Sequence, residues 1–219
     1  PRIERSEIVP PQIEAVVRVL ESADATGHYL FAALHLLAYT GARRGEILAL
    51  DWEHVNLTEG TISIMRSLGR SREGLILGPP KTSNGRRVID LDQRTIEVLQ
   101  AHQGRQLLEK VQAEGAYKDK DLVFANPVGD LINPMRVTRA FQSLAKQCGA
   151  GHVKLHALRH FHASVLFQQK QSLFAVSRRL GHASISTTAD LYGHMLPGSG
   201  KEQADAFAHA MRLKPVDSG

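Results

Sequence analysis

Apolar side chains recur every three or four residues in several stretches of the chain, which is the spacing of one face of an α-helix. The first stretch follows Pro10-Pro11, and because proline is tolerated where a helix begins, we expect a helix at about 11–22. Its apolar face comprises Ile13, Val16, Val17 and Leu20. The run from Tyr29 to Tyr39 is almost wholly apolar but too short to cross a membrane, so it predicts a helix inside the core.

Further helical patterns lie in the second half of the chain. The longest predicts a helix at about 92–113, interrupted at Gly104. Its apolar face comprises Ile96, Leu99, Leu107, Leu108 and Val111. Shorter patterns predict helices around 137–145 and 173–180. After the linker at 197–200, a detached amphipathic helix is expected at about 202–213, which either packs on its own domain or docks on a neighbouring molecule.

Between residues 60 and 91 the apolar period changes from that of a helix to two, which is typical of β-strands. Short strands at 61–65, 75–77 and 87–91 predict a small three-stranded antiparallel sheet. The chain is therefore predicted to be α+β and mainly α-helical. We expect a linker remnant at 1–10, one compact domain at 11–197 and a tail at 198–219 that carries the detached C-terminal helix.

Charge and cysteine content narrow the class of protein. The 219 residues hold 27 Lys and Arg against 22 Asp and Glu, a formal net charge of +5, which favours a polyanionic partner but also suits a solvated surface. The single cysteine, Cys148, cannot form an internal disulfide and is consistent with a reducing compartment. No apolar run approaches 18 residues, so no membrane span is expected.

The stretch from Leu180 to His194 contains a candidate nucleophile, Tyr192, after His182. A phenol has an ordinary pKa near 10, so it attacks poorly at neutral pH unless cations and hydrogen-bond donors surround the group that it attacks. Arg43 lies at an expected helix junction, with Glu46 three residues on and close enough to orient its guanidinium. This pair is also compatible with an ordinary surface ion pair.

Three histidines and an arginine crowd one expected helix start, between Lys154 and His162. His156 lies three residues before Arg159 and four before His160, so these side chains share a helix face. A zinc site is the alternative, but the position after the first histidine is Ala157, which lacks the general base of a His-Glu-x-x-His metallohydrolase. We expect no metal site.

One reaction, displacement at a phosphodiester, would use all of these residue types. Negative charge builds on the non-bridging oxygens, and two planar guanidinium groups, those of Arg43 and Arg159, would hold it. A lysine in the segment 79–87, Lys81, would reach the leaving oxygen and protonate it. The same cationic segment is also compatible with a solvated hairpin tip.

On these residues the sequence resembles the tyrosine recombinase, or phage integrase, family over about residues 9–196. The matching motifs, in the order of the family, are Thr40-Gly41-Ala42-Arg43-Arg44-Gly45-Glu46-Ile47, Pro80-Lys81-Thr82 before Arg86-Arg87, His156-Ala157-Leu158-Arg159-His160, and Leu180-Gly181-His182 followed by Tyr192. The resemblance implies that Tyr192 attacks the scissile phosphate of double-stranded DNA and forms a 3′-phosphotyrosyl link. Arg43 and Arg159 would hold the non-bridging oxygens, and His182 would donate a further hydrogen bond.

The resemblance also implies how protons move. His156 would assist proton transfer from Tyr192, and Lys81 would protonate the leaving 5′-oxygen, so that neither ATP nor a metal would be needed. Glu46 would support the site, and the DNA contacts would come from Arg44, Arg86 and Arg87. One departure is Ala157, because the family commonly has an acidic residue at this position.

The family further implies partners that lie outside this sequence. Its members usually carry an N-terminal helical domain that grips the other face of the DNA, and they assemble as tetramers on DNA, often through the C-terminal helix. Residues 11–197 would then be the catalytic domain, working on DNA in the cytoplasm. Two alternatives are a type IB topoisomerase, which uses the same chemistry without synapsis, and a non-catalytic DNA-binding module. A purely structural role for all six residues is a third alternative, and the occurrence of all six in motifs that follow the family's order disfavours it.

Overall fold

A computed structural model of the chain describes residues 10–72, 74–193 and 200–212. The helices in these ranges are α1 (Ile13–Ala25), α2 (Phe31–Thr40), α3 (Arg44–Ile47), α4 (Gln93–Gln112), α5 (Pro134–Gln147), α6 (Ala157–Gln168), α7 (Leu173–Leu180), α8 (Ile185–Tyr192) and α9 (Gly200–Arg212). The strands are β1 (Val55–Asn56), β2 (Thr61–Ile64), β3 (Ser67–Arg70), β4 (Leu75–Gly78) and β5 (Arg87–Asp90). The predicted class, α+β and mainly helical, is confirmed.

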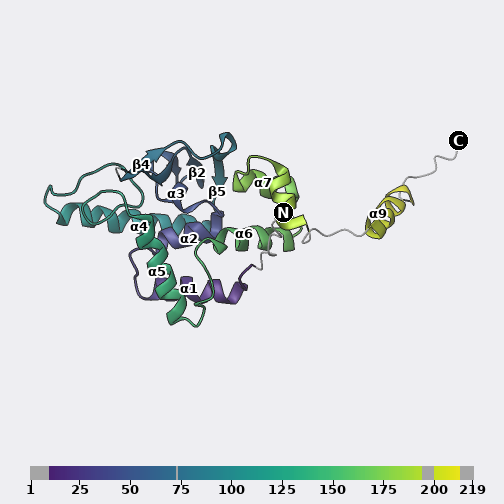
Figure 1. Ribbon diagram of the computed structural model, residues 1–219, viewed down its shortest axis with the longest axis horizontal. Helices are drawn as coiled ribbons and strands as arrows, with labels where there is room; N and C mark the ends of the chain where they lie inside the picture. The colour runs from purple at the N-terminus through teal and green to yellow at the C-terminus, as the bar shows by residue number, and fades with distance from the viewer. Residues whose placement is uncertain (1–9, 73, 194–199, 213–219) are drawn as a thin grey trace.

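Helix α2 forms the centre of the molecule, as its uniformly apolar sequence predicts. Nearly all of its side chains are buried, and it packs against α1, α4 and α6 (Figure 1). The main core surrounds it and takes its largest fully buried side chains from several elements, among them Phe124, Phe141, Leu34, Ile47 and Ile62. A second, small core lies between α6, α7 and α8 and consists of Ala163, Phe167, Val176, Leu180 and Tyr192.

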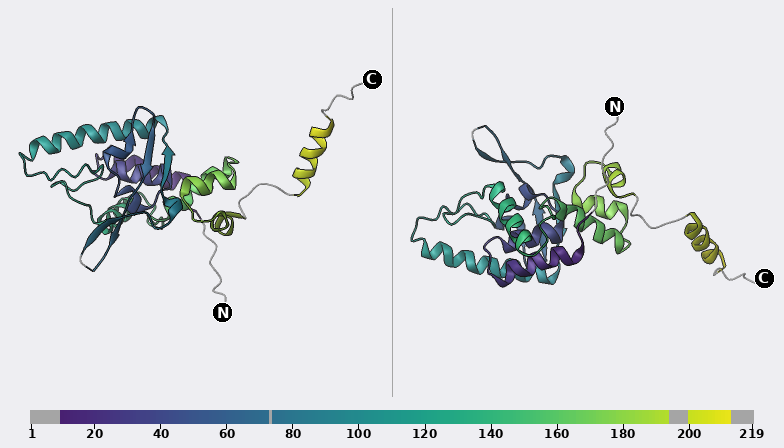
Figure 2. Two further views of the ribbon diagram at one scale, coloured as in Figure 1. Left: turned by 90° about the horizontal axis from the view of Figure 1, so that it is seen from above. Right: turned by 60° about the horizontal axis from the view of Figure 1, so that its bottom comes forward.

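The strands form two sheets rather than the single one that was predicted. Strand β2 lies between β1 and β5, with Ile62 opposite Ile89, and this three-stranded sheet turns its isoleucines into the main core. The predicted strand at 75–77 does not join it, because β4 pairs with β3 in a separate hairpin that projects from the body (Figure 2). Pro79-Pro80 follows β4, and proline cannot donate to a strand ladder, so the chain leaves the hairpin there.

Helix α4 runs through Gly104 without the predicted interruption, and its second half packs differently from the prediction. Leu107, Leu108 and Val111 are 61%, 62% and 69% exposed. This half extends beyond the body (Figure 1), and among the described residues no helix or strand buries these three side chains. Polar side chains attach the helix instead, because His102 and Gln106 bond to the carbonyls of residues 122–123.

Helix α9 coincides with the helix predicted at 202–213, and Figure 1 draws it apart from the body. Residues 204–211 are exposed, including Phe207 at 69% and Met211 at 54%. The predicted linker remnant at 1–10 lies almost wholly outside the described residues, as does most of the predicted linker at 197–200. None of the described helices is both long and apolar enough to cross a membrane.

Candidate active site

The candidate site is built where α2 and α7 end close to one another. Both helices end at a glycine in the left-handed region, Gly41 at φ 63° and Gly181 at φ 68°. A β-carbon on Gly41 would lie 2.7 Å from Leu180 Cδ2, so only glycine allows this approach. The last carbonyls of a helix lack partners within the helix and carry its negative dipole end, so this junction attracts cations.

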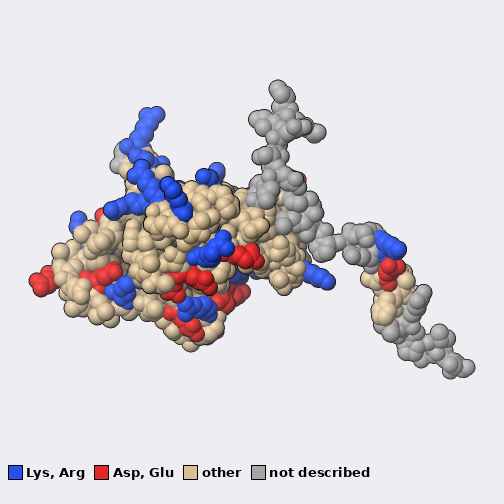
Figure 3. All heavy atoms as spheres, turned by 90° about the horizontal axis from the view of Figure 1, so that it is seen from below, with Lys and Arg blue, Asp and Glu red and all other residues tan. Residues whose placement is uncertain are grey.

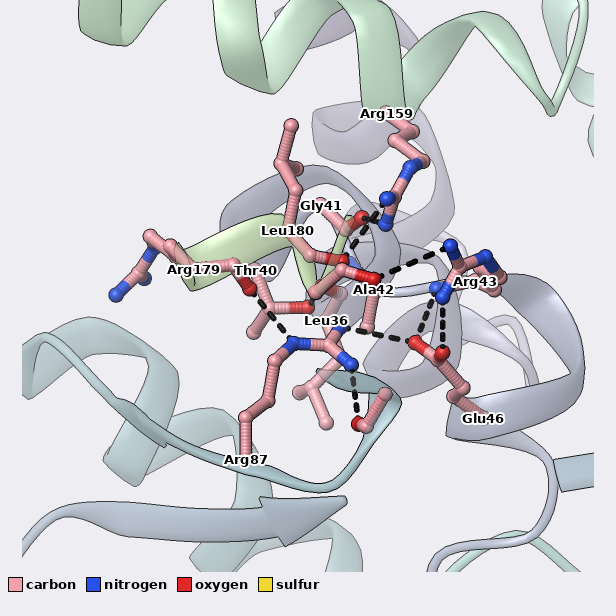
Figure 4. Close-up of polar contacts among 12 residues, drawn as sticks. Leu36, Thr40, Gly41, Ala42, Arg43, Glu46, Arg87, Arg159, Arg179 and Leu180 are labelled. Carbon is pink, nitrogen blue, oxygen red and sulfur yellow. Dashed lines mark hydrogen bonds and ion pairs between the residues drawn. The ribbon is translucent and has the colours of Figure 1, made fainter. Parts of the chain in front are cut away.

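Three arginines from distant segments donate to the last carbonyls of α7 (Figure 4). These bonds are Arg87 Nε to Arg179 O at 2.7 Å, Arg159 Nη2 to Leu180 O at 2.9 Å and Arg43 Nη2 to Gly181 O at 3.3 Å. Arg159 also donates from Nη1 to Gly41 O at 2.7 Å, which joins α6 to the end of α2. Backbone carbonyls thereby help to orient all three arginines.

Glu46 links two of these arginines, as the sequence predicts for Arg43. Its carboxylate accepts from Arg43 Nη1 at 2.7 Å, from the Arg43 backbone N–H at 2.9 Å and from Arg87 Nη2 at 2.9 Å. Burial of Glu46 opposes its ionisation, but the hydrogen bonds and charge of Arg87, with those of Arg43, hold its carboxyl pKa below the usual value. Glu46 is therefore an ionised group inside the protein.

The cluster keeps an excess of positive charge. Burial, with the charge of Arg43, lowers the pKa of Arg159 to about 10, which still leaves its guanidinium protonated at neutral pH. The three arginines face one carboxylate, and the remaining charge is only partly offset by helix-terminal carbonyls. Planar guanidinium groups in such a setting are suited to bind a phosphate anion.

The turn between α7 and α8 holds His182, whose Nδ1 lies 2.6 Å from Thr188 Oγ1. Burial, followed by the charges of Arg159 and Arg43, lowers the pKa of His182 to about 4, so its imidazole is neutral at pH 7. Asn84 Nδ2 donates to the carbonyls of His182 and Ala183, at 3.2 and 3.1 Å. This contact attaches the segment that carries Lys81 to the turn that carries His182.

Tyr192, the last residue of α8, is buried in the small core with only 2% of its surface exposed. Its hydroxyl lies 2.6 Å from Nδ1 of His160, and its ring packs 5.5 Å from that of Phe167. Burial raises the pKa of the phenol to about 12, against the opposing charge of Arg159. The phenol is therefore protonated, and its contact is with His160 rather than with the expected His156.

The histidines of α6 do not converge on one point. His156, at the N-terminus of the helix, is exposed, and its ring meets the edge of the His160 ring at 5.3 Å. His162 faces the opposite way, with Nδ1 3.1 Å from Ala38 O and Nε2 accepting from Arg179 Nε at 3.0 Å. In the part of the chain that the structure describes, the one close group of potential metal ligands is Asp51, Glu53 and His54, and Asp51 there is paired with Arg66 and His54.

Comparison with known proteins identifies the family. The model of the phage integrase family matches residues 8–198. The chain belongs to this family. It is 33% identical over 184 residues to the tyrosine recombinase XerC-like protein of Caldanaerobacter subterraneus subsp. tengcongensis. The match covers 78% of this chain and 47% of that protein. It is 28% identical over 178 residues to the ICEBs1 integrase of Bacillus subtilis, 80% of this chain and 48% of that protein.

The chain thus spans about half the length of the curated relatives it matches. Among solved structures, the Tn1549 transposon integrase in complex with transposon right-end DNA is similar, with a TM-score of 0.74 and 18% identity. The match covers 97% of this chain and 69% of that one. At this identity the likeness shows the shared integrase fold.

The predicted DNA-contacting arginines of this integrase-family chain lie in different environments. Arg44 is half-buried, donates to Thr138 Oγ1 and lines a cleft of about 480 Å³ with Arg43, Arg159 and His156. Arg86 is exposed in a groove of about 920 Å³ between β5 and α7. Arg87 differs from the prediction, because its side chain is 5% exposed and all three nitrogens bond to the protein.

Lys81 is exposed, but it does not lie at a hairpin tip, because β4 and β5 belong to different sheets. The tip of the real hairpin is formed by the turn between β3 and β4. The cations on that projecting hairpin include the exposed Arg70 and Arg72. Figure 3 shows a cluster of blue side chains that projects from a body whose surface carries mixed charges.

Sequence reasoning missed two contacts of the site. Thr188 supports His182, and the only sequence signal is its spacing in a segment rich in hydroxyl residues. His160 was recognised as part of a motif but received no role, and its spacing from His156 placed it on the same face. Nothing in the spacing indicates which of these two rings contacts Tyr192.

Proposed function

We propose that this chain is the catalytic part of a site-specific DNA recombinase that cleaves and rejoins strands through a 3′-phosphotyrosyl intermediate. The observation that carries the proposal is the pair of guanidinium groups of Arg43 and Arg159, held by the carbonyls where α2 and α7 end. Tyr192 lies close enough for its hydroxyl and Arg159 to influence each other's pKa. Family membership supports the same conclusion.

In this mechanism the phenol oxygen of Tyr192 attacks the scissile phosphorus while the bond to the 5′-oxygen breaks. Arg43 and Arg159 hold the non-bridging oxygens, whose charge grows in the transition state. His182 donates a further hydrogen bond from the imidazole edge that does not face Thr188. Lys81 gives a proton to the leaving 5′-oxygen, and the reverse reaction with another 5′-hydroxyl reseals the strand.

In the resting protein Tyr192 is buried, and its hydroxyl lies against Nδ1 of His160. The phenol belongs to the small core, whereas the exposed edge of the arginine cluster faces the cleft lined by Arg44 and His156. The protein without bound DNA therefore keeps an unreactive, protonated phenol.

Arg44 and Arg86 are the proposed DNA contacts, because both line open surfaces beside the arginine cluster. Arg87 instead is proposed to position Glu46 and the end of α7, since each of its three guanidinium nitrogens bonds to the protein. Several phosphate contacts would make DNA binding fall steeply with salt. The proposed partner is double-stranded DNA, and the solved Tn1549 integrase with a similar fold is in complex with transposon right end DNA.

The assembly proposed for the full protein is a tetramer on DNA, with an N-terminal domain gripping the opposite face. The exposed apolar side chains of α9, Phe207 and Met211, support a role for this helix in docking on a neighbouring copy. A type IB topoisomerase remains the alternative enzyme, and a binding module without cleavage is the alternative non-enzyme. The two enzymes differ in outcome, because the topoisomerase relaxes supercoils without exchanging strands.

The test uses the full-length protein and a pool of nicked duplexes with random flanking sequence, without added metal. Cleavage near the nick releases a short strand and traps the covalent complex. We expect a protease-sensitive shifted band on a denaturing gel with wild type and none with Tyr192→Phe, while both bind DNA equally. Equal bands from both proteins would contradict the assignment of Tyr192, and binding without any band would favour the module.

A further inference from the structure

The contact between His160 and Tyr192 determines which imidazole can take up the proton of the phenol. Resemblance to the family assigns proton transfer from Tyr192 to His156, yet the hydroxyl lies 2.6 Å from Nδ1 of His160. His156 touches the pair only through the edge of the His160 ring, at 5.3 Å between centroids. The imidazole in position to exchange a proton with the phenol is therefore that of His160.

The direction of this hydrogen bond follows from the surroundings. A buried hydroxyl must donate its proton to an acceptor. Among the described residues, the Tyr192 hydroxyl has no hydrogen-bond partner other than His160 Nδ1. Nδ1 is then the acceptor, and the neutral ring carries its proton on Nε2. His160 is neutral because burial, followed by the charges of His156 and Arg159, lowers its pKa to about 4.

We infer that His160 is the residue that receives the Tyr192 proton during attack on DNA, and this inference rests on the proposed function. As the bond from the phenol oxygen to phosphorus forms and the bond to the 5′-oxygen breaks, the phenolic proton moves to Nδ1 of His160. The resulting imidazolium returns the proton to Tyr192 when the strand is resealed. Lys81 supplies the separate proton of the leaving oxygen.

The timing of the transfer follows from the two pKa values. A phenol with a pKa of about 12 does not give its proton to an imidazole with a pKa of about 4 in the resting protein. During attack the oxygen loses its basicity as it bonds to phosphorus, so transfer becomes favourable only then. The charged or titratable groups that face His160 are His156 and Arg159 from its own helix, Tyr192 from α8 and His182 from the turn after α7.

The kinetic test compares wild type with His160→Asn, and His156→Asn is the matched control. Asn keeps an acceptor oxygen near the position of Nδ1 but cannot take up the proton. The substrate carries sulfur at the leaving 5′-position, because a thiolate leaves without a proton from Lys81. Unfolding midpoints of all three proteins control for loss of structure. Rates of covalent-complex formation are measured from pH 6 to 8.5.

Wild type should show little pH dependence over this range, because its imidazole is already neutral. His160→Asn should be slower by about 10²–10⁴-fold at pH 7, the usual loss of a general base. Its rate should rise tenfold for each pH unit, since only the small phenolate fraction can react. His156→Asn should keep the flat profile. A flat, wild-type profile for His160→Asn, or a sloped profile for His156→Asn alone, would overturn the inference.

A second measurement needs neither DNA nor activity. The ¹⁵N spectrum of wild-type His160 should show a protonated Nε2 and an unprotonated, hydrogen-bonded Nδ1, whose signal shifts in Tyr192→Phe. A proton on Nδ1 would overturn the inference even if cleavage occurs. Failure of wild type to form any covalent product would instead overturn the proposed function, and the inference that rests on it, whatever the spectrum shows.

Discussion

The main core and the small core hold the candidate site in different ways. The main core fixes α2, α3 and the strand that carries Arg87, so that Arg43 and Glu46 are oriented by many buried neighbours. The small core has five buried side chains, one of which is Tyr192 itself. The proposed phosphate-binding groups are thus preorganised, whereas the proposed nucleophile belongs to a unit with little packing.

The arginine cluster joins the two cores. Arg43 and Arg87 come from elements of the main core, but their acceptors include the carbonyls of Arg179 and Gly181 at the end of α7. Arg159 reaches both sides, with one nitrogen on Gly41 and the other on Leu180. Loosening the small core should therefore affect the nucleophile first and the arginines only through these carbonyls.

Replacing one buried phenylalanine of each core by alanine should have the largest effect on stability. Phe141→Ala and Phe167→Ala each remove a side chain that is at most 1% exposed, at a cost of about 3–5 kcal/mol. We expect Phe141→Ala to lower the free energy of global unfolding. Phe167→Ala should instead raise hydrogen exchange mainly in residues 163–192, since local opening there is the less costly route. Identical exchange patterns in the two variants would contradict the division into two cores.

Removing the charge of Glu46 should cost about 3 kcal/mol at pH 7, because it leaves the buried Arg87 and the partly buried Arg43 without their carboxylate. The pKa of Glu46 is lowered in the folded state, so its stabilisation is fully present above the unfolded pKa and is lost as pH falls through the folded value. The difference in unfolding free energy between wild type and Glu46→Gln should therefore shrink below about pH 4.

The control for this prediction is Glu97→Gln, which removes a carboxylate from a surface pair with Arg94. It should change stability by less than about 0.5 kcal/mol. A cost for Glu46→Gln as small as that of the control would mean that the buried ion pairs do not hold the arginines.

On α8, Thr188→Val removes the partner of His182 while keeping the shape of the side chain. Leaving a buried imidazole nitrogen without its partner should cost about 1–2 kcal/mol. Thermal unfolding measures the cost, and NMR of the His182 ring detects the lost bond. Thr187→Val, at the exposed neighbouring position, should change neither. An unaltered His182 spectrum in Thr188→Val would contradict the assigned contact.

The smallest effect is expected on the second half of α4. Leu108→Gln replaces a side chain that is 62% exposed, so the unfolding free energy should change by no more than about 0.5 kcal/mol. Leu99→Ala on the same helix removes a fully buried side chain and should cost about 2–5 kcal/mol. A comparable cost for Leu108→Gln would show that this face is covered in solution.

The sequence predicted the helices well because apolar spacing reports which face of a helix can be buried. It could not show whether another element is present to cover that face, and Leu107, Leu108 and Val111 are accordingly exposed. The same limit applies to strands. Period two identified residues 75–77 as a strand, but the choice of β3 as partner depends on the local turn at 71–74 and on Pro79-Pro80.

The candidate site was predictable as a set of residue types but not as a set of contacts. Arg86 and Arg87 look alike in the sequence, yet Arg86 faces a groove while Arg87 is buried against Glu46. The difference arises at the start of β5, where successive side chains point to opposite sides. Likewise His156 and His160 lie one helical turn apart, and only the position of α8 brings Tyr192 to His160.

The central claim, that Tyr192 is the nucleophile beside a preorganised arginine pair, is tested most directly by mass spectrometry of the trapped covalent complex. After protease and nuclease digestion, the account predicts one modified peptide, with a 3′-phosphate nucleotide on Tyr192. A nucleotide attached to any other residue, or a 5′-phosphate linkage, would contradict it.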